Sequence, residues 1–294
     1  MRVIALGFFD GVHLGHQALL RECVRQARDK KLSAACISFD AHPSTLLTAQ
    51  RPDLLTLPEE RERLMRAEGI EELLMLHFDT ALMHMSWDDF VRSLLVSEYE
   101  AAHLVCGADF RFGYQGTGNC RLLQALCDEL GIGLSVVPPV CVDGEAVSST
   151  RIRTLLQSGA IAEANTLLGH PYRLTGTVLH GRGLGHTLGF PTANLDFPAA
   201  LLPPAFGVYA CMATLPDGSR RSAVVNLGRR PTVDQGEHIF VEAWVQDYDG
   251  DLYGAALALD FCHFLRPERR FENLDALRMQ VLEDGRQARA LLAE

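Results

Sequence analysis

Short apolar runs alternate with segments of helical periodicity through the first half of the chain. Residues 3–6, 33–39, 73–78, 103–106 and 133–137 have the apolar pattern of strands. Helical spacing is found in residues 17–30, 59–67 and 122–130, and in a further segment opened by the capping pair Ser86 and Asp89. This alternation predicts an α/β fold, a Rossmann-like parallel sheet with helices on both faces. Ligands of such sheets bind beyond the carboxyl ends of the strands.

The pattern changes near residue 170. A helical stretch at 150–168 ends at Gly169, with Pro171 just beyond it as a helix stop. Strand-like runs without intervening helices follow at 174–179, 208–213, 222–226, 239–245 and 255–261. They predict a small antiparallel β-barrel, and the apolar spacing in 274–292 predicts a C-terminal helix packed on it. We therefore expect two domains, 1–170 and 171–294.

Bulk properties narrow the choice of partners. A chain of 294 residues that is 48% hydrophobic is long enough for two cores. The net charge of −10 disfavours a nucleic-acid partner, so any phosphate ligand must be held locally. Eight cysteines without a CxxC pair are typical of buried thiols in a reducing cytosol, and no run of eighteen apolar residues occurs. We expect a cytoplasmic protein without a membrane partner. The sequence leaves open whether the chain forms a homo-oligomer.

Residues 7–16 read GFFDGVHLGH and connect the first predicted strand to the first predicted helix. Glycines let the backbone approach an anion closely, and the first N–H groups of the helix point at it. His13 and His16 add side-chain donors. A bare HxxH pair more often lines a polar turn, but here the strand, the glycines and the helix surround the pair in the right order. The segment predicts a site for nucleotide phosphates.

Two more segments of the first half carry candidate chemistry. GADFRFG at 107–113 follows a predicted strand, and SSTRIR at 148–153 opens a predicted helix. Hydroxyls, backbone N–H groups and two arginines at a helix start suit the phosphates of a nucleoside triphosphate. By itself, SSTRIR is equally consistent with a capped helix whose arginines face solvent. Three such loops at one sheet edge favour the nucleotide interpretation.

Together these three motifs resemble the nucleotidylyltransferase module of bacterial FAD synthetases, members of the HxGH superfamily. The second half resembles the flavin-kinase module through GRGLGHTLGFPTAN at 181–194, NLGRRPT at 226–232, DLYG at 251–254 and FLRPERRF at 264–271. The resemblance covers nearly the whole chain in order. It implies a bifunctional riboflavin kinase/FAD synthetase that uses riboflavin, FMN and ATP as substrates, yields FAD, and requires Mg²⁺.

For the kinase half, the resemblance assigns Thr192 and Asn194 as neutral oxygen ligands of Mg²⁺ and of the nucleotide. It assigns Glu242 as the general base for the ribityl hydroxyl, although strand alternation alone favours an outward-facing carboxylate there. Further contacts are implied for the nucleotide at Gly181, Gly183, Gly185 and Pro191, and for the flavin at Arg266.

For the adenylyltransferase half, the FMN phosphate attacks the α-phosphorus of a second ATP and pyrophosphate leaves. A phosphate is already an anion at neutral pH, so this step needs charge stabilisation rather than a base. The resemblance implies catalytic roles for His13 and His16. Nucleotide contacts are implied for Gly7, Phe9, Asp10, Gly11, Gly15, Ser148, Ser149, Thr150 and Arg151, and flavin contacts for Pro43, Asp109 and Phe112.

One departure from the family pattern keeps alternatives open. Phe8 stands where relatives usually have asparagine, which removes an amide close to the triphosphate. A riboflavin kinase with weakened or lost adenylyltransferase activity therefore stays an alternative, as does a flavin-binding module without catalysis. An adenylyltransferase for another acceptor leaves the PTAN half of the chain unexplained.

Overall fold

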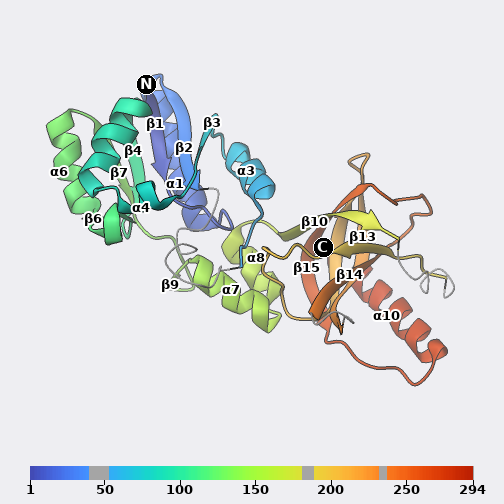
Figure 1. Cartoon of the computed structure of the whole chain (residues 1–294). Coiled ribbons are helices and arrows are strands. Elements are labelled where there is room, and N and C mark those ends of the chain that lie inside the picture. The colour runs from blue at the N-terminus through green and yellow to red at the C-terminus, as the bar shows by residue number, and fades with distance from the viewer. Residues whose placement is uncertain (40–52, 181–188, 232–236, 294) are drawn as a thin grey trace. The chain divides into compact units, whose positions relative to one another are not determined.

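The structure is a computed structural model that describes residues 1–39, 53–180, 189–231 and 237–293. The chain divides into two compact units, Met1–Ser149 and Thr150–Glu294 (Figure 1). The predicted division at residue 170 differs from this one by the helices at 150–168.

The first unit is built on a five-stranded parallel sheet of order β3-β2-β1-β4-β7. Its strands are β1 (Arg2–Leu6), β2 (Ser33–Phe39), β3 (Glu72–Leu76), β4 (Ala101–Gly107) and β7 (Gly133–Val137). The predicted parallel sheet is confirmed, and β2 and β7 have the predicted bounds. Strand β1 is central, so the loop that follows it opens in the middle of the carboxyl edge.

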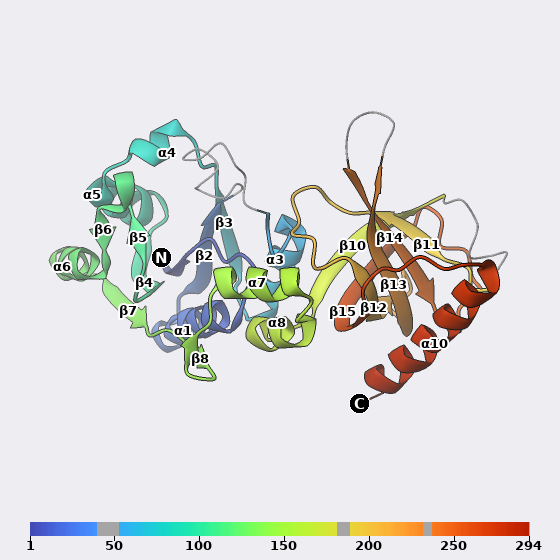
Figure 2. The same ribbon diagram turned by 90° about the horizontal axis from the view of Figure 1, so that it is seen from below.

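Helices cover both faces of this sheet (Figure 2). One hydrophobic cluster joins alternate sheet residues to α1 (Leu14–Lys30) and α3 (Pro58–Ala67). The other joins the remaining sheet residues to the π-helix Phe90–Glu98 and α6 (Cys120–Leu130). Alternation along β1 places successive side chains in opposite clusters, which is why a buried parallel strand is apolar throughout.

Short elements complete the first unit. The predicted cap is confirmed, because Ser86 Oγ accepts a hydrogen bond of 3.0 Å from Asp89 N at the start of α5 (Trp87–Asp89). The remaining short elements, which are too brief to show periodicity in the sequence, are α4 (Thr80–His84), a 3₁₀-helix (Tyr114–Gly116), the pair β5 (Arg111–Phe112) and β6 (Gly118–Asn119), and the pair β8 (Cys141–Val142) and β9 (Glu145–Ala146).

The predicted helical stretch at 150–168 is two helices, α7 (Ser149–Ser158) and α8 (Ile161–Leu168). Gly159 separates them with a φ of +84°, a left-handed conformation that glycine adopts without strain. Helix α8 is fastened to the barrel, because Asn165 Nδ2 donates to the carbonyl of Phe261 at 2.7 Å. As predicted, α8 ends at Gly169, whose φ is +74°.

The second unit is a closed antiparallel barrel of order β10-β11-β14-β13-β12-β15, with β10 and β15 paired to close it. Its strands are β10 (Tyr172–Leu179), β11 (Ala193–Asp196), β12 (Gly207–Thr214), β13 (Arg220–Pro231), β14 (Glu237–Val245) and β15 (Ala256–Arg266). The predicted barrel is confirmed. Strand β11 was not predicted, because four residues beside a glycine-rich loop give little alternation.

Helix α10 (Leu274–Leu292) has the predicted bounds and packs on the barrel, mainly on β12 and β13. Gly285 is needed where the helix meets β14, because a Cβ there would lie 2.6 Å from the Trp244 ring. Gln246 Nε2 donates to the Gly285 carbonyl at 3.0 Å. Close approach and a hydrogen bond therefore fix the middle of α10.

All eight cysteines are free, and five of them are buried as predicted. Cys141 is exposed and Cys120 and Cys262 are half-buried, so the expectation of uniformly buried thiols is wrong for these three. Within the described ranges, the helices are all too short or too polar to span a lipid bilayer.

Candidate active sites

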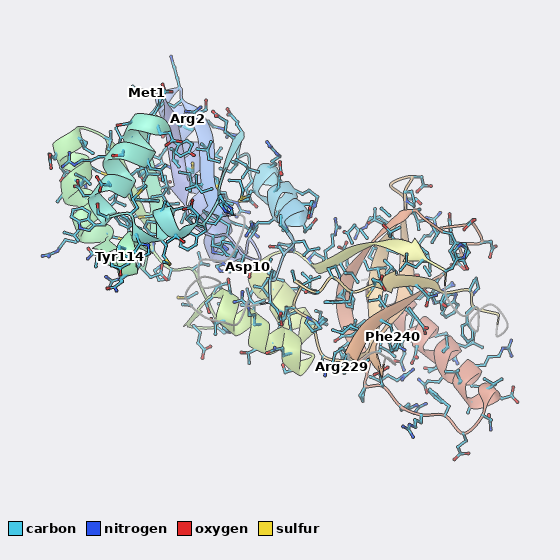
Figure 3. All side chains as sticks on the ribbon, in the orientation of Figure 1. Met1, Arg2, Asp10, Tyr114, Arg229 and Phe240 are labelled. Carbon is cyan, nitrogen blue, oxygen red and sulfur yellow. The ribbon has the colours of Figure 1, made fainter. Side chains whose placement is uncertain are left out.

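The loop at residues 7–16, called the histidine loop below, leaves the carboxyl end of β1 in a strained conformation. Its backbone has positive φ at Phe9 (58°), Gly11 (81°) and Val12 (38°). Two of these are not glycines, and such residues persist in this region only when their surroundings hold them. Figure 3 places Asp10 of this loop at the opposite end of the sheet from Met1 and Arg2.

Contacts to residues 55 and 56 provide that support. The buried Asp10 carboxylate accepts hydrogen bonds from the backbone N of Leu55 at 2.9 Å and of Thr56 at 3.1 Å. The backbone N of Gly11 donates to Thr56 Oγ1 at 3.0 Å. Ser149 Oγ donates to the Asp10 carbonyl at 3.1 Å. These hydrogen bonds of Asp10 and Gly11 therefore stabilise the strained conformation of the loop.

His13 is the N-cap of α1. Its Nδ1 accepts a hydrogen bond of 3.3 Å from the backbone N of His16, so the proton of the neutral ring is on Nε2. No acidic residue occurs in the first turn of α1. The helix terminus therefore keeps its positive character and can bind an anion.

His16 stacks on His13, with ring centroids 3.7 Å apart and planes 13° apart. Burial lowers the pKa of His16 well below 6.5, and the charges of His13 and Arg61 lower it further. Its Nδ1 is buried and has no hydrogen-bond partner among the described residues. A neutral His16 near pH 7 can donate one hydrogen bond and accept another.

Arg61 of α3 lies under the histidine loop and is fully buried. Its guanidinium donates to the carbonyls of Phe8 at 3.3 Å and Phe39 at 3.0 Å, and lies 4.5 Å from the centre of the Phe8 ring. Phe8 thus packs on a cation. No local pattern in the sequence indicated Arg61, because its partners come from two other elements.

A cavity of about 390 Å³ opens in front of the histidine loop. It brings together most of the residues predicted for the adenylyltransferase half, namely Gly7, Phe9, His13, Gly15, His16, Asp109, Ser148 and Ser149. Pro138 and Pro139 also line it and were not predicted. Their signal was present, because they directly follow the predicted strand at 133–137 at the carboxyl edge of the sheet.

Some predicted residues lie elsewhere. Phe112 is 7% exposed and packs in the hydrophobic cluster with Phe90, while Phe110, which stacks on Phe112 at 5.3 Å, lines the cavity. Thr150 and Arg151 lie in the first turn of α7 and belong to the second unit. Pro43 lies outside the described residues.

In the barrel, strand register aligns three polar residues. Glu242 of β14 lies directly opposite Asn194 of β11 on one side and opposite Asn226 of β13 on the other. Side chains opposite each other in antiparallel strands have Cβ atoms about 4.5–5.5 Å apart, so Asn194, Glu242 and Asn226 form one polar row. Asn226 Oδ1 is buried without a hydrogen-bond partner among the described residues. The sequence pointed to the motif NLGRRPT that contains Asn226, but not to a role for Asn226 itself.

A second cavity, of about 450 Å³, lies at the barrel, and Asn194, Glu242 and Asn226 are not among the residues that line it. Pro191 and Thr192 line it, together with Ala243 and the run 248–253 that contains DLYG. The Tyr253 ring at its edge stacks on His180 at 3.9 Å. Gly181, Gly183 and Gly185 lie outside the described residues.

Arg266, predicted to contact flavin, forms an ion pair with α10. Its Nη2 lies 2.8 Å from Oδ2 of Asp284, whose side chain is only 1% exposed. Removing one partner of such a buried pair leaves an uncompensated charge. In this structure, Arg266 therefore fastens α10 to β15.

The donor set at the barrel fits a magnesium ion that also binds phosphate. Thr192 and Asn194 supply neutral oxygens, and Asn194 Nδ2 donates to the Thr192 carbonyl at 3.4 Å, which leaves its Oδ1 for a ligand. Across the described parts of the chain, no three or more His, Cys, Asp or Glu side chains gather as a metal cluster. Mg²⁺ usually binds through one or two protein oxygens, waters and substrate phosphates.

Comparisons with known proteins give a family for each part of the chain. Residues 1–151 match the family model of FAD synthetase, and residues 168–292 match that of riboflavin kinase. The chain is 34% identical to a bifunctional riboflavin kinase/FMN adenylyltransferase of Listeria monocytogenes, over 100% of this chain and 93% of the relative. It is 35% identical to the protein of that name in Escherichia coli, over 98% and 91% respectively.

A solved structure is similar over nearly the same length. The crystal structure described as a macrolide-efflux protein from Streptococcus pneumoniae superposes with a TM-score of 0.90 at 31% identity. The match covers 98% of this chain and 94% of that one. The folds of both units, in the same order along the chain, thus resemble those of a protein solved by experiment.

Proposed function

Since this chain belongs to the family of bifunctional riboflavin kinase/FMN adenylyltransferases, we propose that it makes FMN from riboflavin and ATP, and then FAD from FMN and a second ATP. It is then a transferase with two activities on small-molecule substrates. We propose that the barrel carries the kinase and the parallel-sheet unit the adenylyltransferase. The observation that carries this assignment is the presence of a separate cavity in each unit, each lined by motifs of the corresponding module.

In the kinase site, the 5′-hydroxyl of riboflavin attacks the γ-phosphorus of ATP. A hydroxyl is a weak nucleophile, so a base near it contributes to the rate. We assign this role to Glu242, held between the amides of Asn194 and Asn226 in the polar row. The unpartnered Asn226 Oδ1 is suited to accept a hydrogen bond from a hydroxyl of the substrate.

Magnesium would be held by Thr192 and Asn194, where it would neutralise charge on the phosphates of ATP. The side chains of the protein then contribute by positioning the nucleotide and the base relative to each other. Thr192 fixes the nucleotide end of the site, and β11–β14 pairing fixes the distance from Asn194 to Glu242. The glycine-rich segment with Gly181, Gly183 and Gly185 remains our proposal for backbone contacts to ATP.

In the adenylyltransferase site, the FMN phosphate attacks the α-phosphorus of ATP and displaces pyrophosphate. Charge develops on the leaving group, and donors fixed in advance stabilise it. His13 Nε2–H, neutral His16 and the N-terminus of α1 are the donors we assign, with Ser148 and Ser149 as further contacts. Arg151 of the same motif stays a prediction from the sequence. Asp109 and Phe110 at the cavity wall are our assignment for the heterocycle.

We propose that the boundary between the functional modules differs from the boundary between the two compact units, which falls after Ser149. The family models leave residues 152–167 to neither module, whereas contacts group α7 and α8 with the barrel. The boundary between the two functional modules then falls within residues 150–170 of the sequence.

The free cysteines further support a cytoplasmic location, because reducing compartments keep thiols unpaired.

The direct test incubates the full chain with riboflavin, ATP and Mg²⁺ and separates FMN from FAD over time. We expect FMN to appear first and FAD to follow, with pyrophosphate released in step with FAD. Accumulation of FMN without FAD, even when FMN is supplied directly, would overturn the assignment of the first unit. Absence of both products would overturn the assignment as an enzyme.

A further inference from the structure

Two cysteine side chains meet beside the cavity of the first unit. Sγ of Cys106 and Sγ of Cys120 are 3.9 Å apart, although the residues are 14 positions apart in the sequence. Cys106 is the penultimate residue of β4 and Cys120 is the first residue of α6. A disulfide bond is about 2.05 Å long, so the sulfur atoms need to approach by only about 2 Å.

The thiol of Cys120 supports the cavity wall. It donates to the carbonyl of Gly107 at 3.2 Å and lies 3.5 Å from that of Ala108. Gly107 and Ala108 line the cavity together with Asp109 and Phe110. The proton on Cys120 Sγ is therefore part of what holds this wall in place.

We propose that Cys106 and Cys120 are a redox modification site, which a peroxide converts to a disulfide that slows adenylyl transfer. The effect on activity rests on the proposed function of the first unit. Formation of the disulfide does not.

The chemistry proceeds in two balanced steps. Cys120 Sγ attacks one oxygen of hydrogen peroxide, the O–O bond breaks, and water leaves while Cys120 becomes a sulfenic acid. Cys106 Sγ then attacks Cys120 Sγ, the S–S bond forms, and the hydroxyl leaves as a second water. Two thiols are oxidised by two electrons, peroxide is reduced by two, and both thiol protons end in the waters.

Accessibility sets the order of these steps. Cys106 is fully buried, whereas Cys120 is half-buried and within reach of a small oxidant. Burial, and then the neighbouring Cys120, raise the pKa of the Cys106 thiol. The more accessible Cys120 therefore attacks the peroxide first, and the buried Cys106 acts as the resolving thiol.

The disulfide changes the cavity wall in two ways. A disulfide sulfur has no proton, so the carbonyls of Gly107 and Ala108 lose their donor. Bond formation also draws the first turn of α6 toward the end of β4. We expect the KM of adenylyl transfer to rise several-fold, with no change in riboflavin phosphorylation in the barrel.

The experiment treats the reduced full-length protein with a small excess of hydrogen peroxide, removes the peroxide with catalase, and measures both activities in the same sample. Peptide mapping without reductant should find Cys106 joined to Cys120, and dithiothreitol should restore adenylyl transfer. Cys106→Ala, which lacks the resolving thiol but keeps the contacts of Cys120 with the carbonyls of Gly107 and Ala108, should keep its basal activity and form no such disulfide. Cys141→Ser, which removes an exposed thiol elsewhere, should behave as the unchanged protein.

A map without the Cys106–Cys120 peptide would overturn the proposal. So would the disulfide with unaltered adenylyl transfer, or an equal loss of kinase activity. If the reduced protein makes FMN but no FAD, the proposed function of the first unit fails, and the peptide map still decides whether the modification site exists.

Discussion

The histidine loop of the parallel-sheet unit and the polar row of the barrel prepare their sites with different groups. The loop presents backbone N–H groups, a helix terminus and neutral imidazoles, held in a strained conformation by Asp10 and Arg61. The row presents side chains fixed by strand register, with a carboxylate between two amides. The difference follows the nucleophile, since a phosphate arrives ionised and a hydroxyl has to lose its proton.

The supports of the two sites differ as well. The loop depends on contacts from residues 55, 56 and 61, all within its own unit. The barrel depends on strand pairing along its whole length and on two packed elements, α8 and α10. The experiments below test whether these supports and chemistries are as separate as the geometry indicates.

The largest effect is expected from the position of a chain cut. Fragment 150–294 keeps α8, whose Ile161, Leu167 and Leu168 are at most 2% exposed, whereas fragment 171–294 loses them. Three buried aliphatic side chains at about 1.5–3 kcal/mol each amount to roughly 5 kcal/mol or more, close to the whole stability of a domain. We expect 150–294 to melt cooperatively by circular dichroism and 171–294 to be largely unfolded. Equal stability of the two fragments would contradict the packing described for α8.

Glu242→Gln tests the base of the kinase site. The amide keeps the shape of the side chain but accepts protons poorly, so riboflavin phosphorylation should fall by about 10²–10⁴-fold. Adenylylation of supplied FMN should change by less than about twofold. A parallel loss of both activities would show that the sites are coupled, and unchanged phosphorylation would remove Glu242 from the mechanism.

His16→Ala should give the reverse result. Loss of one preorganised donor costs about 10²–10³-fold in comparable sites, so FAD formation from FMN should fall by about that factor while phosphorylation persists. The matched variant is His84→Ala in α4, a histidine of the same unit that does not line the cavity. Comparable loss in His84→Ala would indicate a general effect on the unit rather than on its site.

The smallest effect concerns pH. Burial lowers the pKa of His16 below 6.5, so the unfolded chain binds more protons than the folded one between the two pKa values. The stability that depends on a neutral His16 is present above pH 6.5 and is lost as pH falls below it. Urea unfolding from pH 7.5 to 5 should show this decline in the unaltered protein and a shallower one in His16→Asn. Identical slopes would mean that His16 does not titrate with folding.

The elements that were predicted from the sequence are those in which apolar residues repeat regularly over neighbouring positions. The bounds of β2, β7 and α10 followed directly from apolar spacing, since each is long enough for its period to repeat. The helical stretch at 150–168 had the correct type but contained an unpredicted break at Gly159. Strand β11 is too short for such a signal, although the motif that contains it was recognised.

The sequence by itself determined the two architectures, their order, and the motifs that identify the family, because strand and helix periodicity and local turn chemistry are written in neighbouring residues. Only the tertiary structure decided that Arg61 and Thr56 support the histidine loop, that Arg266 pairs with Asp284, and that Cys106 meets Cys120. These contacts join residues distant in the chain. Their partners depend on strand order, register and helix packing, which no local pattern specifies.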